Sequence, residues 1–474
     1  MTSPETTLPP EPVDEVSLGI QPVPQRLRKL GALDVGVLWG NLAVGILVLA
    51  AGALLVTPVS AGGLGLRFGN ALVAIVVGSV AGSVLLALVA VAGHDRGVPS
   101  MVLLRPVLGR YGSYGATLVN VAQLIGWTGF EFWAMALFAN RVSKQVFDFD
   151  AFLLWLALVA IFCTGLALIG PMKVVRVWLE RAGIWVVLVA GGYLTLYYLF
   201  KGGFGPFFGS TAGASPFGVA VDLVIVMPVS WLPLVADYNR FSVTRRQNFT
   251  GTFAGYTLGN IWFYALGALL ILAGGFADAS PEGIAAGILG ISAGVVVGTV
   301  MLVSLLAGET DEAWADIYSA AVSIQNFLPR VSQRTLVLVI AASGTVIAAV
   351  VTAGDYETFL FLLGSVFVPL FGVVLATWVA GGLAPSGRDG PREPEFRPAN
   401  VLVWIAGIGL YHWINPTGPS WWINWVTDHV PGAGEHAWLG SSLPSFAFAF
   451  GAGLLVEWMA RRRVAPTRTA LSRS

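Results

Sequence analysis

The sequence predicts an all-α integral membrane protein with twelve transmembrane helices. Only 11% of its 474 residues are charged, against about 25% in a typical soluble domain, and 56% are hydrophobic. Apolar stretches of about 20 residues, long enough to cross the hydrocarbon core of a bilayer, recur along the chain. The predicted spans are 34–57, 68–93, 112–138, 150–170, 179–200, 216–236, 251–275, 290–326, 335–353, 357–381, 399–414 and 438–460.

The placement of basic residues supports this count independently of hydropathy. If the N-terminus is cytoplasmic, 22 Lys and Arg residues fall in cytoplasmic segments and only four fall outside, as expected because basic residues are retained on the cytoplasmic side. The cytoplasmic group is Arg26, Arg28, Lys29, Arg96, Arg105, Arg110, Lys173, Arg176, Arg181, Arg240, Arg245, Arg246, Arg330, Arg334, Arg388, Arg392, Arg397 and five residues from Arg461 onward; the outside group is Arg67, Arg141, Lys144 and Lys201. We therefore expect a multi-pass protein of the plasma (inner) membrane with both termini in the cytoplasm.

The first and sixth spans contain residues that weaken a helix. Gly40, Asn41 and Gly45 do so in "LWGNLAVGIL", and Pro228 and Pro233 each remove a backbone donor in "VMPVSWLPLVADYNRF". Transporters built from inverted repeats place interrupted helices at corresponding positions of the two repeats, beside the binding site. If spans 1–5 and 6–10 are such repeats, the two spans correspond and both helices are broken. Simple packing is the alternative, because Gly and Pro are common in membrane helices.

The third span carries a polar stripe. In "NVAQLIGWTGFEFW", Asn120, Gln123, Trp127 and Glu131 recur at helical spacing and share one face. A polar face on a lipid-buried helix turns toward protein or a cavity. An interhelical hydrogen-bond seam is the alternative, although Glu131 argues against it because an unpaired carboxylate is costly in a membrane.

Four acids cluster in the eighth span, "LLAGETDEAWADIYSAA", with no nearby basic residue in the sequence. Helical geometry puts Glu309, Glu312 and Asp316 on one side and turns Asp311 about 140° away from Asp316. Asp311, beside the Thr310 hydroxyl, has the oxygen ligands that suit a hard cation, whereas Asp316 suits a polar substrate. For Glu309 and Glu312, the alternative is that they lie near an aqueous mouth and stay solvated.

Other features exclude several functions. Acidic and basic residues balance, which gives no reason to expect a nucleic-acid partner. The single cysteine, Cys163, lies in an apolar run and has no partner for an internal disulfide. The four histidines show no metal-binding spacing such as HExxH, so an enzyme is not expected. Residues 1–25 lack the apolar core of a signal peptide and are predicted to be a disordered cytoplasmic tail.

Three segments resemble the nucleobase–cation symport-1 family, which includes permeases for cytosine, purines, allantoin, hydantoins and hydroxymethylpyrimidine. They are "GVPSMVLLRPVLGRYGSYGATLVNVAQLIGWTGFEFW", "SWLPLVADYNRF" and "DEAWADIYSAAVSIQNFLP". The resemblance implies an amino-acid/sodium symporter-like fold of two inverted five-helix repeats plus two C-terminal helices. The expected segments are 1–25 (tail), 26–200 (first repeat), 201–383 (second repeat), 384–398 (cytoplasmic linker), 399–460 (helices 11 and 12) and 461–474 (cytoplasmic tail).

The resemblance also implies the site residues. The family's third-helix Trp and amide map to Trp127 and Glu131, a second aromatic near the sixth-helix break maps to Trp231, and an eighth-helix Asn maps to Asp316. Carboxylates thus replace two amides. The candidate substrate-binding residues are Trp127, Glu131, Gln123, Asn41, Ser230, Trp231 and Asp316; the candidate cation-binding residues are Asn41, Val44, Ala307, Thr310 and Asp311. Arg105 and Arg240 are candidate gating residues on the cytoplasmic side.

The predicted function is cation-coupled uptake of a nucleobase or related planar heterocycle, such as cytosine, a purine or hydroxymethylpyrimidine, by alternating access. A ring would stack on the indoles, and the acids would accept from amino or ring N–H groups. The coupling ion is sodium or a proton, no cofactor is expected, and we expect a monomer in the lipid bilayer. An ion-coupled symporter of an amino acid, hydantoin or allantoin on the same fold is the alternative, and a membrane enzyme or an open channel is less well supported.

Overall fold

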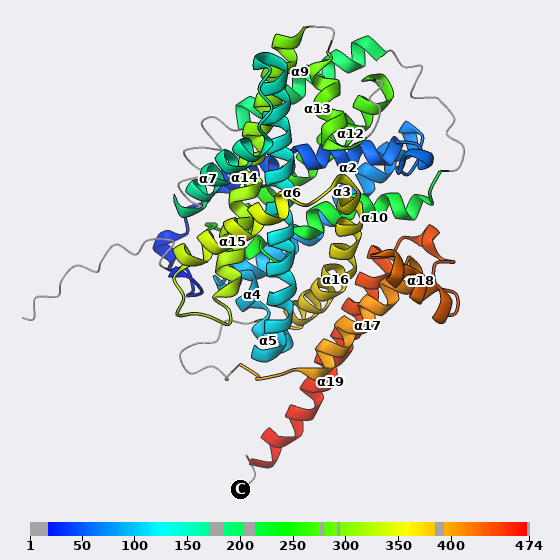
Figure 1. Ribbon diagram of the computed structural model, residues 1–474. Coiled ribbons are helices and arrows are strands. Elements are labelled where there is room, and N and C mark those ends of the chain that lie inside the picture. The colour runs from blue at the N-terminus through cyan, green and yellow to red at the C-terminus, as the bar shows by residue number, and fades with distance from the viewer. Residues whose placement is uncertain are drawn as a thin grey trace, which may run out of the picture.

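The computed structural model describes residues 18–169, 184–202, 214–274, 279–291, 294–383 and 393–471. In these ranges the chain consists of helices and connecting loops, with one isolated backbone bridge between Leu30 and Ser242 (Figure 1). The predicted all-α class is therefore confirmed. Residues 1–17 of the predicted tail, 384–392 of the linker and 472–474 at the C-terminus lie outside the described residues.

The α-helices follow one another as a long series. They are α1 (Ala32–Asn41), α2 (Ile46–Val56), α3 (Phe68–Arg96), α4 (Ser100–Leu103), α5 (Arg105–Leu108), α6 (Arg110–Phe147), α7 (Phe152–Ile169), α9 (Ile184–Gly202), α10 (Phe217–Ser230), α11 (Val235–Asn239), α12 (Arg245–Gly274), α13 (Pro281–Leu289), α14 (Val295–Ile324), α15 (Gln333–Ala348), α16 (Ala353–Val379), α17 (Pro398–Ile414), α18 (Ser420–His429) and α19 (Ser442–Leu471).

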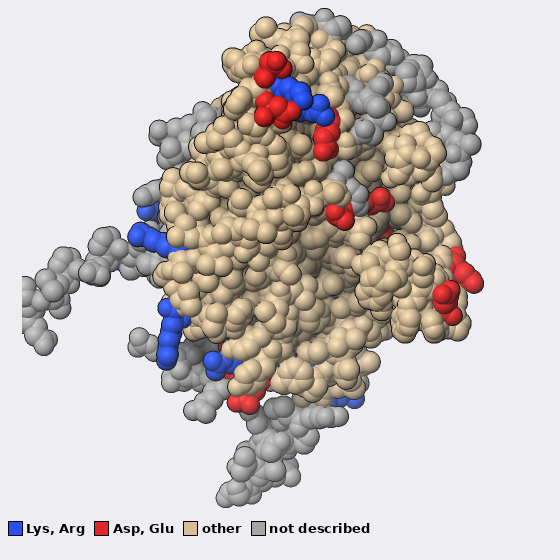
Figure 2. Space-filling view, in the orientation of Figure 1, with Lys and Arg blue, Asp and Glu red and all other residues tan. Residues whose placement is uncertain are grey.

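Six of the described helices are individually long and apolar enough to cross a membrane: α3, α6, α7, α12, α16 and α19. The pair α1 and α2 passes the same test as one span bent by 59°. Part of α9 and the whole of α10, α15 and α17 form shorter apolar helices, and α14 carries four acids within its 30 residues. Helix length and composition therefore establish a multi-span protein without fixing the predicted count of twelve. Figure 2 shows a broad uncharged area on one face, with most charged side chains toward its edges.

Both predicted helix breaks are present. Helix α1 ends at Asn41 and α2 begins at Ile46, after Gly45, so the backbone between them departs from the regular α-helix over about one turn. Helix α10 continues through Pro228 and ends at Ser230, and α11 begins at Val235. The second break therefore surrounds Pro233, which lacks the N–H that a continuous helix requires.

Close helix packing holds the broken first span in place. Helix α12 lies against α1, α2 and α3. A β-carbon added to Gly255 of α12 would collide with the backbone carbonyl of Gly36 in α1, so only glycine permits this approach. Helix α14 packs along α6, and α19 packs along α16 and α17 toward the C-terminus (Figure 1). The first, third, sixth and eighth predicted spans thus meet in the interior.

The predicted N-terminal tail differs from expectation where the structure describes it. Residues 18–25 are not a free tail, because Leu18 and Val23 are buried and the Val23 N–H donates to the Gly97 carbonyl (2.8 Å). At the other end, α19 continues through residue 461 to Leu471 as a helix. Residues 18–25 are packed and not disordered because their apolar side chains cover a hydrophobic surface formed by other segments.

Candidate functional site

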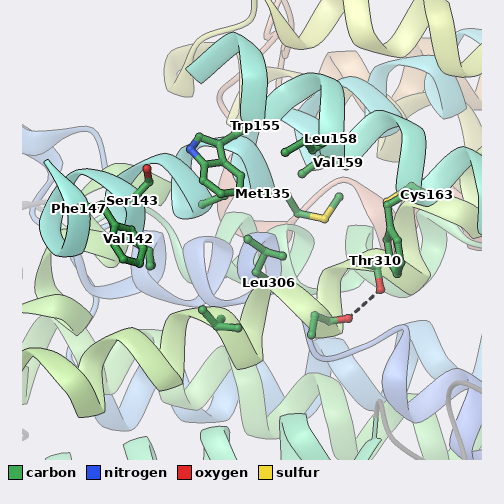
Figure 3. A pocket seen from close by; sticks show the side chains of 14 residues that line it. Met135, Val142, Ser143, Phe147, Trp155, Leu158, Val159, Cys163, Leu306 and Thr310 are labelled. Carbon is green, nitrogen blue, oxygen red and sulfur yellow. Dashed lines mark hydrogen bonds between the residues drawn. The ribbon is translucent and has the colours of Figure 1, made fainter. Parts of the chain in front are cut away.

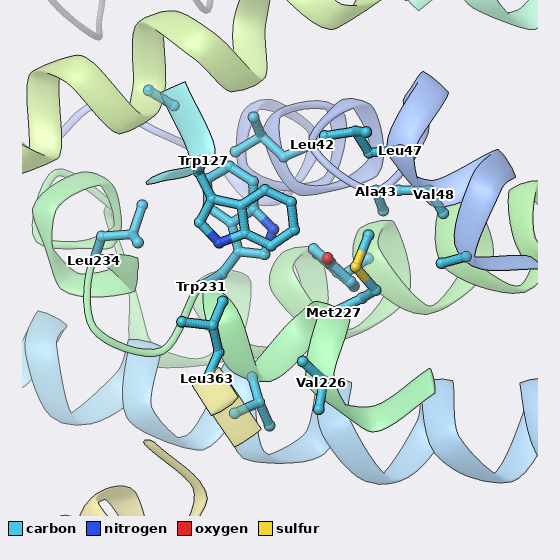
Figure 4. Close-up of a cluster of buried hydrophobic side chains, with 14 of the residues drawn as sticks. Leu42, Ala43, Leu47, Val48, Trp127, Val226, Met227, Trp231, Leu234 and Leu363 are labelled. Carbon is cyan, nitrogen blue, oxygen red and sulfur yellow. The ribbon is translucent and has the colours of Figure 1, made fainter. Parts of the chain in front are cut away.

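A small enclosed cavity lies where α6, α14 and the break after α10 meet. Its lining residues are Trp127, Glu131, Met227, Ser230, Trp231, Glu312 and Asp316. Trp127 and Trp231 lie close together in the centre of the buried cluster, beside Met227 and the residues around the first break (Figure 4). The cavity volume is about 10 Å³, which is room for about one water molecule. The structure therefore represents a closed form in which the site is almost filled by its own side chains.

The polar stripe of α6 divides into two functional halves. Asn120 Nδ2 donates to Ser323 Oγ (2.9 Å), and Gln123 Nε2 donates to Asn120 Oδ1 (2.9 Å) and to the Ser230 carbonyl (3.1 Å). These two residues form the hydrogen-bond seam that was the alternative interpretation. One and two turns further along, Trp127 and Glu131 line the cavity instead. Gln123 is therefore a neighbour of the cavity rather than part of its wall.

Each indole of the cavity is supported from behind by another aromatic ring. Trp127 packs edge-on against Phe359 of α16, with centroids 5.2 Å apart, and Trp231 packs edge-on against Trp39 of α1, at 5.9 Å. Trp39 is itself held by a hydrogen bond from its Nε1 to Asn239 Oδ1 (2.7 Å). Because Trp231 lies in the non-helical segment after α10, its ring can move with that segment while Trp127 stays on a continuous helix.

Three carboxyl groups line this cavity. Glu131 is 1% exposed, Glu312 3% and Asp316 2%. Glu131 Oε2 and Glu312 Oε1 have no hydrogen-bond partner. Buried, unpartnered carboxylate oxygens are costly, so this edge of the cavity is suited to a ligand that brings donors or positive charge.

Glu309 and Glu312 do not lie at an aqueous mouth, contrary to the alternative raised from the sequence. Both are buried against the first helix break. Glu309 Oε2 accepts from the Ile46 N–H (2.5 Å) at the N-terminus of α2, where the helix dipole favours an acceptor. A β-carbon on Gly45 would come within 2.7 Å of the same oxygen and would also meet Glu312. These acids therefore join α14 to the broken first span.

The predicted cation-binding residues lie on the other side of α14. Asn41 Nδ2 donates to Asp311 Oδ2 (2.5 Å), which leaves Asp311 Oδ1 and Asn41 Oδ1 without partners. The Thr310 hydroxyl donates to the Ala307 carbonyl (2.8 Å), and the Val44 N–H donates to the Asn41 carbonyl (3.1 Å). Carboxylate, amide, hydroxyl and carbonyl oxygens are ligands for a hard cation. These ligand types suit sodium, and Asp311 Oδ1 and Asn41 Oδ1 have no hydrogen-bond partner. No cluster of three or more His, Cys, Asp or Glu side chains suited to a metal occurs in the described part of the chain.

A larger apolar pocket of about 400 Å³ opens beside these residues, between α6, α7 and α14. It is lined by Met135, Trp155, Leu158, Cys163 and Leu306 among others, and it reaches Ala307 and Thr310 (Figure 3). Its lining is almost entirely apolar, and the indole N–H of Trp155 is its one buried polar group without a partner among the described residues that line it. A planar polar ring would find few hydrogen-bond groups there. We do not assign it as the substrate site.

The candidate gating residues lie near the α3–α4 connection and the end of α14. Arg105 donates from Nε to Asn326 Oδ1 (2.7 Å) and from Nη2 to the Asn326 carbonyl (2.9 Å). Burial lowers the pKa of the Arg105 guanidinium, and the Glu393 carboxylate opposes this effect. Arg240 is fully buried and donates to the carbonyls of Asp237 (3.2 Å) and Gly19 (3.0 Å). Neither arginine reaches the cavity; both hold together segments on one side of it.

Sequence reasoning missed two further contacts of the site region. Met227 lines the cavity, and its position one turn before Ser230 was the available signal. Asp222 of α10 is buried and accepts from the N–H groups of Ser441 (2.5 Å) and Ser442 (2.9 Å) at the start of α19. Asp222 lies in an apolar run with no charged partner nearby in the sequence. Such an isolated acid indicates a contact with a distant segment.

Solved structures of similar architecture establish the fold. The chain aligns with Mhp1, described as a nucleobase-cation-symport-1 family transporter in a closed conformation with bromovinylhydantoin bound, at a TM-score of 0.74 and 18% identity over 95% of this chain and 96% of that one. It also aligns with MhsT in complex with L-phenylalanine, at a TM-score of 0.58 and 14% identity over 89% of this chain and 98% of that one. The protein is thus a multi-pass membrane protein with the amino-acid/sodium symporter-like fold.

Relatives of known name are permeases. The chain is 25% identical to the cytosine permease of Escherichia coli (strain K12) over 364 residues, which cover 74% of this chain and 80% of that protein. It is also 25% identical to the putative purine-cytosine permease YxlA of Bacillus subtilis (strain 168) over 257 residues, or 53% of each chain. Residues 22–384 match the family described as "Permease for cytosine/purines, uracil, thiamine, allantoin". The chain therefore belongs to this family of transporters, the nucleobase–cation symport-1 permeases, and not to a family of enzymes.

Proposed function

We propose that this protein is a secondary active transporter that couples the entry of sodium or protons to the uptake of a nucleobase-like planar heterocycle. The observation that carries the proposal is the cavity beside the two helix breaks, which is lined by two indoles and three carboxyl groups. The names of the E. coli and B. subtilis relatives support cytosine or a purine as the class of ring.

In this proposal Trp127 and Trp231 hold the two faces of the ring, while Glu131, Asp316 and Ser230 meet its polar edge. A nucleobase does not fit into about 10 Å³, since ligand sites usually measure about 300 Å³ or more. Loading therefore requires movement. In this proposal Trp231, on the segment between α10 and α11, moves away from Trp127 and returns over the bound ring.

The coupling ion binds at Asp311. Sodium would be held by the Asp311 carboxylate, the Thr310 hydroxyl, and carbonyls such as those of Ala307 and Val44; alternatively, Asp311 itself takes up a proton. Asn41 supports the coupling because its side chain bonds to Asp311 while its backbone ends α1. An ion at Asp311 thereby alters the same break that borders the substrate cavity, and by linkage the substrate strengthens ion binding equally.

We further propose the finer architecture implied by the family. Twelve spans would comprise inverted repeats at 26–200 and 201–383 and two further helices in 399–460, in a monomer with both termini in the cytoplasm. Arg105 and Arg240 would then close the cytoplasmic route, since Arg240 joins α11 to residue Gly19 and Arg105 joins α5 to the end of α14.

An amino acid is a weaker candidate substrate on the same fold. Its α-carboxylate would enter a cavity whose three ionisable lining groups are all acids. Like charges in a site of low dielectric repel one another strongly.

Uptake into proteoliposomes tests the proposed function. Purified protein is supplied with radiolabelled cytosine, adenine, hydroxymethylpyrimidine, uracil and hydantoin, under an inward sodium gradient or an inward pH gradient. We expect saturable uptake of at least one ring that collapses when both gradients are removed. Uptake of amino acids alone, or heterocycle flux that neither saturates nor depends on either gradient, would contradict the proposal.

A further inference from the structure

We propose that the transported ring carries an amidine-type edge, N=C–NH2, and is bound as its amidinium cation. This inference rests on the proposed function and names the substrate class of the same cavity. Cytosine, adenine and 4-aminopyrimidines have such an edge, whereas uracil, hypoxanthine and hydantoin do not.

The first argument is the charge around the cavity. Glu131, Glu312 and Asp316 line it, and Glu309 and Asp311 lie on the same helix segment as the last two. The other titratable side chains that interact with these acids are Cys163 of α7, Tyr238 of α11, Tyr256 of α12 and Tyr356 of α16. None of them is basic, and none of the five acids forms an ion pair with a described Lys, Arg or His. These acids are therefore neutralised by bound protons or by a positive charge that a ligand brings.

The second argument is the shortage of hydrogen-bond donors at the polar edge. The Ser230 hydroxyl already donates to the Met227 carbonyl (2.7 Å), so only its lone pairs remain for a ligand. Gln123 Nε2 is occupied by Asn120 and the Ser230 carbonyl. Apart from the indole N–H groups, the cavity thus presents acceptors, and a ring rich in carbonyls would leave its own acceptors unsatisfied.

An amidinium edge complements this arrangement. Its two parallel N–H donors match the two oxygens of one carboxylate, and such bidentate, charge-assisted pairs are stronger than neutral hydrogen bonds. The unpartnered Glu131 Oε2 and Glu312 Oε1 are available acceptors. The delocalised positive charge also lies between two indole faces, which attract cations.

The proton balance is simple. A ring that enters neutral gains one proton at its N=C nitrogen, either from solution or from a protonated carboxyl group of the cavity. In the second case that carboxyl group becomes a carboxylate and the ring becomes the cation. No other bond forms or breaks, and each ring crosses the membrane with one proton bound to it.

Binding of matched probes tests the inference in wild-type protein. Benzamidine is a permanently protonated amidinium at neutral pH, and benzamide is a neutral molecule of nearly the same shape. We expect benzamidine to bind at least about ten-fold more tightly, and cytosine to exceed uracil by a similar factor, because a charge-assisted bidentate pair is lost in each comparison. Equal or weaker binding of benzamidine and cytosine relative to their neutral partners would overturn the inference.

Variants of the cavity acids test which residues produce the preference for an amidinium. Glu131→Gln and Asp316→Asn should each reduce the benzamidine-to-benzamide affinity ratio by about ten-fold or more, while uracil affinity is unchanged or improved. Glu357→Gln, an acid of α16 that lines a different pocket, is the matched control and should keep the wild-type ratio. An unchanged ratio in both cavity variants would also overturn the inference, and the wild-type comparison decides it if a variant does not fold.

The same panel separates the two proposals. If uracil, hydantoin and benzamide bind saturably and as well as the amidines, the substrate class is wrong and the proposed transport of heterocycles stands. If no ring of either type binds saturably, both are wrong.

Discussion

The carboxyl groups of Glu131 in α6 and Asp316 in α14 line the same buried cavity, which no basic side chain of the described chain lines. The two residues are 185 positions apart, and they come from the two predicted repeats. Where the family resemblance implies amides, this chain has a pair of acids. We propose that this pair determines the polarity of the ring that the site accepts.

Trp127→Ala should weaken heterocycle binding by about ten- to a hundred-fold, because base–aromatic stacking contributes about 1–3 kcal/mol. The protein should remain folded, since the truncated side chain borders an existing cavity. Equilibrium binding of labelled cytosine checks the affinity, and the thermal midpoint of unfolding checks the fold. Trp127→Phe is the control and should retain much of the affinity. Wild-type affinity in Trp127→Ala would contradict the proposed stacking of the ring on Trp127.

Asp311→Asn should uncouple the ion from the substrate. In the wild type, saturating sodium or the favourable pH should raise substrate affinity by about 5- to 150-fold, the usual size of such coupling. The asparagine variant should keep its substrate affinity measured without the ion and lose most of that increase. Titrations in sodium and in potassium at fixed pH, repeated across pH, also distinguish the two ions. Full coupling in the variant would show that the cation does not bind at Asp311.

Gly45→Ala should destabilise the protein by about 1–3 kcal/mol, as expected for an added methyl group in a filled interior. Its β-carbon would meet the carboxylates of Glu309 and Glu312 at the first helix break. Gly192→Ala is the matched control, because a β-carbon there has no neighbour within 4 Å. Thermal unfolding in detergent compares the two variants. A stable, active Gly45→Ala protein would show that the two acids do not pack against the break.

Asp222→Ala should destabilise the contact between α10 and α19 by about 1–3 kcal/mol, because two buried backbone N–H groups lose their acceptor. Hydrogen exchange at Ser441 and Ser442 should accelerate, while exchange in α6 stays slow. Asp222→Asn, which keeps one acceptor oxygen, should have a smaller effect. If exchange at the start of α19 does not change in either variant, the carboxylate does not hold this helix end.

Several parts of the site could be predicted from periodicity and composition. Gly45 and Pro233 marked the two breaks because each weakens local helix geometry independently of the rest of the fold. The same helical arithmetic put Trp127 beside Glu131 and turned Asp311 away from Asp316, and the structure agrees, since α6 and α14 are both regular there.

Other contacts could not be predicted because they depend on how distant helices pack. Glu309 accepts from Ile46, 263 positions away, and nothing local distinguishes an acid that caps a broken helix from one that stays solvated. Asp222 and Ser441 are 219 positions apart. The burial of Leu18 and Val23 likewise depends on a surface formed by other segments.

The most direct test of the central claim is an experimental structure of the protein with a saturating transported heterocycle. We predict density for the ring between the indoles of Trp127 and Trp231, with its polar edge within hydrogen-bond distance of Glu131 or Asp316 and a cavity enlarged from about 10 Å³. Density for the ring in the apolar pocket of α6, α7 and α14, with the two indoles still closed on each other, would contradict the account.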